Sequence, residues 1–358
     1  MHKKCPHCHF YILADKGPFR KTFEEAILLE IERILPLLKE YTIVSIYLGG
    51  GTPSLLGPSG IYSLLEKLPI LPSQEITLEA NPENVTKEQM KQMRAIGINR
   101  ISLGVQTLDN ALLHRIGRGH TADEAISAIE NTYEAGIDNI SIDLMYDLPN
   151  QTVKSWTETL DQVKNLPITH LSLYNLTIEP QTLFYKNKKK LTPQLPSPEK
   201  SLAMLFAATE RLPAFGLKRY EISAFGRPSR HNTGYWTARP FLGLGPSAFS
   251  FWQGKRLRNY CDLKAYSKAL KAGTSAIDFI DELSLLERQA ELLAIHLRMI
   301  DGVNLTAFEE LHGTLFPSLA EALNEAITKE WVCPPPQLQL TPKGLLFYDS
   351  VAELLIQI

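Results

Sequence analysis

TIVSIYLGGGTPS, residues 42–54 of this 358-residue chain, joins an apolar, β-branched run to three consecutive glycines. The run predicts a buried strand, because β-branched residues favour strands and the glycines bound the run. Since glycine has no Cβ, the backbone after this strand can approach a ligand closely. Ligands of α/β barrels bind at the carboxyl ends of parallel strands, although the same glycines would also serve a simple turn. The stretch therefore favours an α/β fold with a site after this strand.

The alternation of strand and helix continues on both sides of this stretch, from residue 20 to about residue 220. Further apolar runs predict strands at residues 76–79, 100–105, 139–145 and 170–176. Amphipathic patterns predict helices at residues 23–41, 60–68, 87–95, 122–135, 153–166 and 199–212. Thr121 and Glu124 have the spacing of a capping box, and Gly97 and Gly136 stand where two helices are expected to end. Repeated strand–helix units predict a parallel sheet.

A second region begins near Asp281 and reads differently. A leucine-rich helical pattern at residues 283–299, a short strand at 338–340 and a last helix after Lys343-Gly344 predict a small, mostly helical C-terminal domain. Residues 186–198, rich in Lys and Pro, are expected to form an exposed loop. We divide the chain into a barrel domain at 1–225, a connecting region at 226–280 and a helical domain at 281–358.

Composition limits the classes of partner. The 37 Lys and Arg residues nearly balance the 39 Asp and Glu residues, which argues against nucleic acid or an anionic membrane surface and favours a small ligand. We find no apolar run of about 18 residues and no apolar segment after the charged start, so we expect neither membrane insertion nor a signal peptide. Only four cysteines occur, two of them in a C-x-x-C, which is typical of a reducing compartment. We expect a cytoplasmic protein.

Polar side chains follow the later strands at corresponding places. Glu79, Gln106 and Asp143 come at or after three successive strands, as do Tyr174 and Asn175 after the next. Arg118 and His120 lie in a loop before a helix, where they can reach an anion. Each residue alone could cap a helix. Because parallel strands present their carboxyl ends to one rim, we expect these side chains to form a single site.

The two N-terminal cysteines, Cys5 and Cys8, can share a metal on one tight loop. A four-iron cluster takes three or four thiolates, and structural zinc takes four nitrogen or sulfur ligands. Cys261 and Cys333 have no second cysteine at ligand spacing. From the residues alone, an iron–sulfur cluster, a zinc site and two incidental cysteines all remain open.

Taken in order, the motifs resemble those of one family. They are CPHCHF (5–10), GGGTPS (49–54), EANP (79–82), SLGVQT (102–107), DLM (143–145) and LYNLTIEP (173–180). The chain is similar over nearly its whole length to radical S-adenosylmethionine proteins related to oxygen-independent coproporphyrinogen III oxidase. The resemblance implies a partial (β/α)6 barrel, open on one side and capped by the small helical domain.

The resemblance also implies cofactors. In that family a cysteine loop holds a [4Fe–4S] cluster through three ligands, here including Cys5 and Cys8, and the fourth iron chelates S-adenosylmethionine. Matching positions assign Gly50, Gly51 and Thr52 to the methionyl end of S-adenosylmethionine. The positions that contact the remainder of S-adenosylmethionine are Glu79, Gln106, Arg118 and Asp143.

Two features resemble the haem-chaperone (HemW) branch of the family rather than its oxidases. Phe10 stands where the oxidases have a further cysteine. The segment HNTGYW, residues 231–236, matches the H-N-x-x-Y-W haem motif and follows Tyr220-Glu221-Ile222-Ser223. The match implies that His231 ligates haem iron, that Asn232 belongs to the haem site, and that Tyr235 and Trp236 stack on the macrocycle.

The chain departs from the family pattern in a few places. The C-x-x-x-C-x-x-C spacing puts the first cluster ligand at residue 1, which is Met1, and a thioether is a poor substitute for a thiolate. The strand that precedes the cysteine loop in the family is also not found; a start placed too far downstream would account for the strand but not for the ligand. His2, His7 or His9 are alternative ligands. Smaller departures are Asp147, Asn150 and Ala224.

The leading hypothesis is a haem chaperone that binds haem and passes it to an acceptor protein. It would use a [4Fe–4S] cluster, S-adenosylmethionine and a reductant for the cluster. Two alternatives are radical decarboxylation of coproporphyrinogen III and a degenerate scaffold that lacks the cluster.

Overall fold

A computed structural model describes residues 5–8, 11–13 and 17–358 of the chain. The chain forms two compact units. The first consists of Met1–Lys218, Ser223–Arg227 and Cys261–Thr274, and the second of Arg219–Ile222, Pro228–Tyr260 and Ser275–Ile358.

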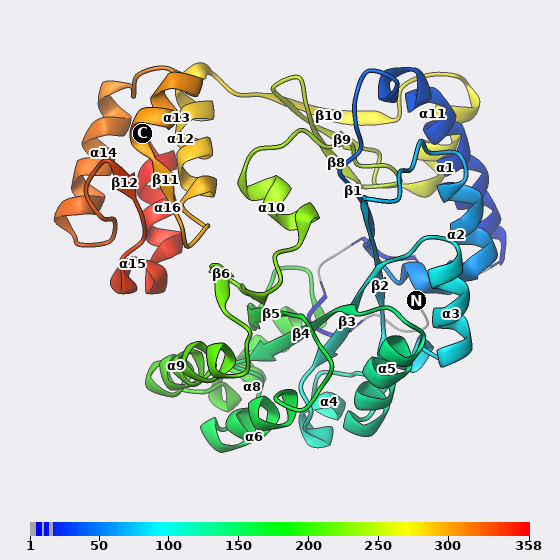
Figure 1. The fold of residues 1–358 in the computed structure, drawn as a ribbon, viewed down its shortest axis with the longest axis horizontal. Helices are drawn as coiled ribbons and strands as arrows, with labels where there is room; N and C mark the ends of the chain where they lie inside the picture. The colour runs from blue at the N-terminus through cyan, green and yellow to red at the C-terminus, as the bar shows by residue number, and fades with distance from the viewer. Residues whose placement is uncertain (1–4, 9–10, 14–16) are drawn as a thin grey trace. The chain divides into compact units, whose positions relative to one another are not determined.

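A parallel sheet forms the centre of the first unit (Figure 1). Its strands are β1 (Ser45–Leu48), β2 (Glu75–Ala80), β3 (Arg100–Gln106), β4 (Asn139–Tyr146) and β5 (His170–Asn175). They pair in chain order, and β7 (Ala224–Gly226) pairs antiparallel with β5. The five predicted strands are confirmed, although β1 begins three residues later than expected.

Helices precede, connect or follow these strands; the sequence pattern predicts six of them, but not those at Asn110–Arg115 and Leu263–Lys271. They are α1 (Gly17–Leu38), α2 (Gly57–Leu65), α3 (Lys87–Ala95), α4 (Asn110–Arg115), α5 (Ala122–Glu134), α6 (Val153–Val163), α9 (Pro198–Ala214) and α11 (Leu263–Lys271), with two 3₁₀ turns, η1 (Pro53–Leu56) and η2 (Pro82–Asn84). The predicted capping box of Thr121 and Glu124 starts α5. Gly97 and Gly136 have φ of 103° and 86°, so both occupy the left-handed conformation expected after a helix.

The prediction of an exposed loop at residues 186–198 is wrong in part. The segment begins at the end of α7 (Leu183–Lys186) and contains α8 (Lys188–Leu191) and η3 (Thr192–Gln194). Leu191 and Phe184 are buried in a small apolar cluster with Leu148 and Leu176. The lysines of α8 are exposed, as predicted, whereas Leu191 packs into this cluster.

The two faces of the parallel sheet differ in chemistry. Alternate strand residues such as Leu78, Leu103 and Ile142 pack with helix residues in one large core. The residues between them are mostly polar and point to the other face, because side chains alternate along a strand. These polar residues include Tyr47, Thr77, Glu79, Arg100, Ser102, Ser141, Asp143, His170 and Ser172. The concave interior of the barrel is therefore polar, and its apolar outer face is covered by helices (Figure 1).

The second unit combines helices with two small sheets. Its elements are β6 (Arg219–Glu221), α10 (Arg230–Trp236), β8 (Phe249–Trp252), β9 (Lys255–Asn259), β10 (Ile277–Glu282), α12 (Leu285–His296), β11 (Val303–Asn304), α13 (Leu305–His312), α14 (Pro317–Thr328), β12 (Gln337–Leu338), α15 (Pro342–Leu346) and α16 (Tyr348–Ile356). Helices α12, α13, α14 and α16 enclose one apolar core, as the sequence predicted for a mostly helical region.

The antiparallel sheet β10-β9-β8 was not predicted from the sequence. Charged residues of β9 and β10 form ion pairs with one another, Arg258 with Asp278 and Arg256 with Asp281, so these two strands lack the apolar runs by which buried strands are found. The short strand β8 has only four residues. In the same segment, a Cβ at Gly243 would lie 1.9 Å from the carbonyl oxygen of Phe249. The backbone there therefore requires glycine for structural reasons.

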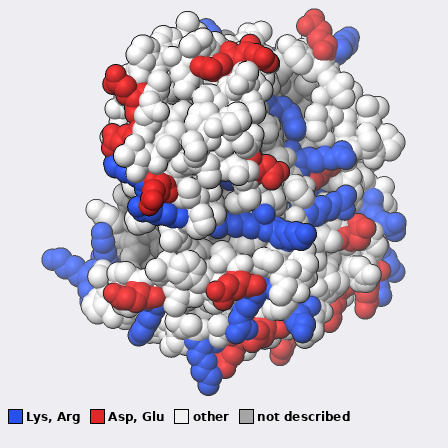
Figure 2. All heavy atoms as spheres, turned by 60° about the vertical axis from the view of Figure 1, so that its left-hand side comes forward, with Lys and Arg blue, Asp and Glu red and all other residues white. Residues whose placement is uncertain are grey.

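The surface carries both signs of charge. Figure 2 shows acidic and basic side chains together on the face that it draws, in keeping with a net charge of −2. None of the helices in the described residues has both the length and the apolar composition needed to cross a bilayer.

Candidate functional site

The glycine loop after β1 is held open by Glu79. The backbone N–H of Gly50 donates to Oε2 of Glu79 over 3.1 Å, and the Tyr47 hydroxyl donates to Oε1 over 2.7 Å. Gly50 has a φ of 105°, which glycine adopts without strain. A Cβ at Gly50 or Gly51 would have no heavy atom within 4 Å, so the space next to this backbone is open. The loop therefore fits a ligand that lies directly on its backbone.

A second group of polar atoms meets over Gly104 in β3. A Cβ at this position would lie 3.1 Å from Nε2 of Gln106, 3.2 Å from Nη2 of Arg118 and 3.4 Å from Oδ1 of Asn81. Gln106 has a φ of 71°, and the register of β3 with β4 shifts between Leu103 and Gln106. This irregularity turns Gln106 toward the other two side chains, as a bulge does. Left-handed backbone in a non-glycine residue is costly and is concentrated at functional sites.

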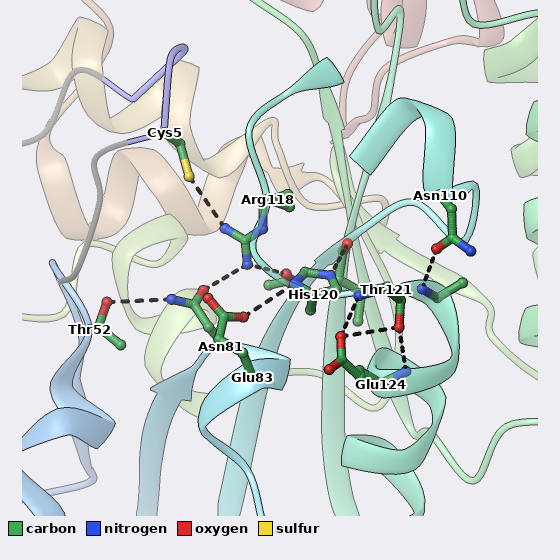
Figure 3. Close-up of polar contacts among 12 residues, drawn as sticks. Cys5, Thr52, Asn81, Glu83, Asn110, Arg118, His120, Thr121 and Glu124 are labelled. Atoms are coloured by element: carbon green, nitrogen blue, oxygen red, sulfur yellow. Dashed lines mark hydrogen bonds and ion pairs between the residues drawn. The ribbon is translucent and has the colours of Figure 1, made fainter. Parts of the chain in front are cut away.

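Arg118 joins the cysteine loop to the ends of two strands (Figure 3). Its Nη2 donates to Oδ1 of Asn81 over 2.7 Å and to the carbonyl oxygen of Gly104 over 2.6 Å. Its Nη1 donates to Sγ of Cys5 over 3.6 Å. Asn81 in turn donates to the hydroxyl of Thr52 over 3.4 Å. Cys5, Thr52 and Arg118, which lie far apart in the sequence, are thus linked by one chain of hydrogen bonds.

Other rim residues have structural roles instead. His120 is buried, and its two ring nitrogens lie 3.3 Å from Oε2 of Glu83 and 3.2 Å from the carbonyl oxygen of Val105, so neither is available to an anion (Figure 3). Asn175 donates to Asp147 over 2.8 Å. Asp147 and Asn150 have φ of 64° and 68° and thus adopt the left-handed conformation, which Asp and Asn tolerate better than most residues.

The carboxyl groups of Glu79 and Asp143 share the polar interior of the barrel. Burial and, to a smaller extent, the negative charge of Glu79 raise the pKa of Asp143 to about 7. A hydrogen bond with Ser172 and the positive charges of Arg100 and Arg118 oppose this rise. Burial also raises the pKa of Glu79, against the hydrogen bonds from Tyr47 and Gly50 and the charge of Arg100. Two adjacent acidic groups in a desolvated cavity suit a cationic ligand.

The cysteine loop supplies two thiol groups on one turn. The N–H of Cys8 donates to the carbonyl oxygen of Cys5 over 3.1 Å, and the turn is fixed by the N–H of Phe184, which donates to Pro6 over 3.0 Å. The ring of His7 lies 6.0 Å from the ring of Phe184, and burial lowers the pKa of His7 to about 4. Thus His7 is packed as a neutral ring.

A complete metal site is not found in the described part of the chain. Among residues 5–8, 11–13 and 17–358, no three His, Cys, Asp or Glu side chains gather in an arrangement that could hold a metal ion. His7 therefore does not form a ligand set with Cys5 and Cys8. Met1, His2, His9 and Phe10 lie outside the described residues. The described donors supply two of the three thiolates that a four-iron cluster of this type takes.

The haem-like motif lies in the second unit, on helix α10. The hydroxyl of Ser229 caps this helix by accepting from the N–H of Asn232 over 3.3 Å. Residues 231 and 235 are one helical turn apart, and Nε2 of His231 lies 2.8 Å from the hydroxyl of Tyr235. Tyr235 also packs edge-on against Phe241, with ring centroids 4.6 Å apart. His231 and Tyr235 thus share one face of a short, well-braced helix.

Arg298 braces the far end of this helix. Its guanidinium lies 4.2 Å from the ring centroid of Trp236 and 5.1 Å from that of Tyr348. It also forms an ion pair with Glu221 over 3.1 Å, and both side chains are largely buried. A cation–π contact in a desolvated place contributes about 2 kcal/mol. Arg298 therefore holds Trp236 against the segment that carries the Tyr220-Glu221-Ile222-Ser223 motif.

Comparison with known proteins identifies the family. The family model described as "Radical SAM superfamily" matches residues 2–163. The "Heme chaperone HemW" of Lactococcus lactis is 34% identical over 318 residues, which cover 86% of this chain and 83% of the relative. The chain belongs to the HemW family of radical S-adenosylmethionine proteins. HemW of Bacillus subtilis is 33% identical over 293 residues, covering 78% of the chain and 77% of the relative.

A solved structure confirms the fold of this HemW family member. The coproporphyrinogen III oxidase HemN of Escherichia coli, described as a radical SAM enzyme, superimposes with a TM-score of 0.87 over 99% of this chain and 87% of that one. The two sequences are 23% identical, so the similarity establishes the radical SAM fold alone. Family membership implies S-adenosylmethionine and a [4Fe–4S] cluster as cofactors.

Several residues of the site were missed from the sequence. Asn81 was quoted only as part of a motif, yet it lies two residues after Glu79, directly after β2, and contacts Thr52 and Arg118. Tyr47 lies two residues before the first glycine of the loop, and its hydroxyl donates a hydrogen bond to Glu79. The period of two along each strand was the signal that could have found both. Arg298 had no such signal, because its contacts join segments more than 60 residues apart.

The raised pKa of Asp143 predicts how folding stability depends on pH. Because this pKa rises from 3.8 to about 7 on folding, the folded chain holds a proton that the unfolded chain has lost. Stability is therefore lost as pH rises from about 4 to about 7. In Asp143→Asn this loss is absent, so the stability of the variant relative to wild type should increase across that window. Urea denaturation of the cofactor-free protein at several pH values measures the difference. Asp138→Asn, at an exposed position, is the control; a pH-independent difference for Asp143→Asn would contradict the assignment.

Proposed function

We propose that this chain is a haem chaperone, which binds haem on helix α10 and passes it to an acceptor protein. The curated relatives that cover most of the chain carry the name heme chaperone HemW. The observation that carries the proposal is helix α10, which contains every defining residue of the H-N-x-x-Y-W motif. Arg298 fixes the Trp236 ring of this motif in place. A histidine with an aromatic neighbour is a suitable pair for an iron porphyrin.

Each residue of the motif has a definite part in this proposal. His231 binds the haem iron through a ring nitrogen; when it does so through Nε2, Tyr235 releases its hydrogen bond to that atom. Tyr235 and Trp236 present aromatic surface to the macrocycle. Asn232, on the first turn of α10, supplies a polar side chain beside the histidine. Arg298 keeps Trp236 in place.

The barrel supports the second part of the proposal, a site for S-adenosylmethionine. Gly50, Gly51 and Thr52 would receive its methionyl end, because the backbone there is open to a ligand. Glu79 and Asp143 provide negative charge for a ligand that carries a sulfonium and an ammonium group, and Gln106 and Arg118 provide hydrogen bonds over Gly104. Cys5 and Cys8 provide two ligands for the cluster, whose third ligand is not among the described residues. When bound and reduced by an electron donor, the cluster supplies the electron for radical chemistry in this family.

Haem binding provides the direct test of the chaperone proposal. Titration of the full chain with haemin, followed at the Soret band, should give saturable binding near one haem per chain. In His231→Ala the affinity should fall by about tenfold or more and the spectrum should change, because the iron loses a protein ligand. His114→Ala, which removes an exposed histidine of α4, is the matched control and should bind as wild type. The proposal fails if wild type shows no saturable binding or if His231→Ala binds equally well. Formation of product from coproporphyrinogen III would replace it with the oxidase function.

A glycine substitution tests the S-adenosylmethionine site. Gly51 lies outside the left-handed region and has open space around its Cβ position, so Gly51→Val should fold normally. The valine side chain would instead occupy the space assigned to the ligand, and affinity for S-adenosylmethionine should fall by about tenfold or more. Equilibrium dialysis of anaerobically reconstituted protein measures this affinity. Gly17→Val, at another open glycine, serves as the control; unchanged affinity in Gly51→Val would place the ligand elsewhere.

A further inference from the structure

Arg100 lies deep inside the barrel, at the first residue of β3. Only 2% of its surface is exposed, which is rare for an arginine. In the sheet it pairs with Thr77 of β2 and Asn139 of β4. Glu79 is one inward-facing position further along β2, and Asp143 is two such positions further along β4. Arg100 therefore lies below the two carboxyl groups that face the rim.

Arg100 requires opposite charge nearby, because its side chain is almost wholly removed from water. Its Nε is buried and has no hydrogen-bond partner among the described residues. The nearby ring of His170 accepts or donates a hydrogen bond at Ser141 over 2.7 Å. Burial and the charge of Arg100 lower the pKa of His170 to about 3, so that ring is neutral. A buried cation is stable only when opposite charge lies near it, and the carboxyl groups above it meet that need.

The charges that act on the two carboxyl groups can be compared. Asp143 faces Glu79, Ser172, Arg100 and Arg118, and its own charge acts on Tyr47. Glu79 faces Tyr47, the N–H of Gly50 and Arg100. Arg100 is thus the cation whose charge acts on both groups. Arg118 is engaged at the rim with Asn81, Gly104 and Cys5.

We propose that Arg100 is a positioning residue of the S-adenosylmethionine site, whose charge beneath Glu79 and Asp143 favours their ionised forms against the effect of burial, so that the cationic ligand meets carboxylates. Arg100 does not touch the ligand; it acts through the two side chains above it. Without its charge, burial favours the protonated form of both groups, and a protonated pair attracts a sulfonium or ammonium group weakly. This inference rests on the proposed S-adenosylmethionine site and adds the residue that sets its charge.

The test compares a neutral and a charged replacement over a range of pH. Arg100→Met keeps the length of the side chain without its charge, and Arg100→Lys keeps the charge. Affinity of reconstituted protein for S-adenosylmethionine should fall about tenfold at neutral pH in Arg100→Met and should recover as pH rises, because alkali ionises the carboxyl groups that the arginine no longer holds. Arg100→Lys should stay close to wild type. Arg115→Met, at an exposed arginine of α4, is the matched control. An equal loss of affinity at every pH, or no loss, would overturn the inference.

A second measurement separates this inference from the proposed function. Infrared difference spectroscopy detects the protonated carboxyl group directly and needs no ligand. In Arg100→Met its band should persist to higher pH than in wild type, and an additional Asp143→Asn change should reduce it. If wild type does not bind S-adenosylmethionine, the proposed site fails, yet the infrared titration still decides whether Arg100 controls the carboxyl groups. A band that titrates identically with and without Arg100 overturns the inference. Should Arg100→Met fail to fold, Arg100→Gln takes its place in both measurements.

Discussion

The structure of the barrel depends on one constraint: each of its parallel strands must be apolar toward the helices and polar toward the interior. Because side chains alternate along a strand, a shift of one residue in any strand would exchange the two faces. Residues such as Leu103 and Ile142 bury their surface against the helices and stabilise the fold. The residues between them, among them Glu79 and Asp143, are thereby fixed inside the barrel. The site is thus a consequence of the same pattern that drives folding.

Burying polar groups inside the barrel costs free energy, and the hydrogen bonds and ion pairs of these groups reduce that cost. Charged groups removed from water need partners of opposite charge or hydrogen-bond donors. Glu79 obtains two donors, from Tyr47 and Gly50, and Arg118 is bonded to Asn81 and to the carbonyl of Gly104. Asp143 is less well satisfied, and its pKa is raised to about 7 as a result. A cationic ligand would bring positive charge to the Asp143 carboxyl group, which the protein itself stabilises only in part. A polar interior is thus suited to such a ligand.

The sequence predicted those features of the molecule that depend on local pattern. The strands and helices of the barrel follow from apolar periodicity, and the start of α5 follows from the capping box of Thr121. Features that depend on contacts between distant segments were not predicted. The left-handed turn of Gln106 arises from its register with β4, and Leu191 is buried because distant residues form its pocket. The sheet β10-β9-β8 was missed because paired charges interrupt the apolar pattern of β9 and β10.

The sequence motif predicted the candidate haem site, but it did not predict the contacts that hold helix α10 in place. Local sequence identified His231 and Tyr235, which lie one helical turn apart. The brace that Arg298 provides joins Trp236, Glu221 and Tyr348, from three segments of the second unit. Such a brace explains how a helix of seven residues, too short to be stable alone, holds its side chains in a defined arrangement.

Hydrogen–deuterium exchange of the reconstituted protein, with and without S-adenosylmethionine, tests most directly whether the strand ends form one site. The account predicts that the ligand slows exchange together in the glycine loop after β1 and in the segments that follow β2, β3 and β4, while the outer helices change little. Protection confined to one of these segments, or found only outside the barrel, would contradict it.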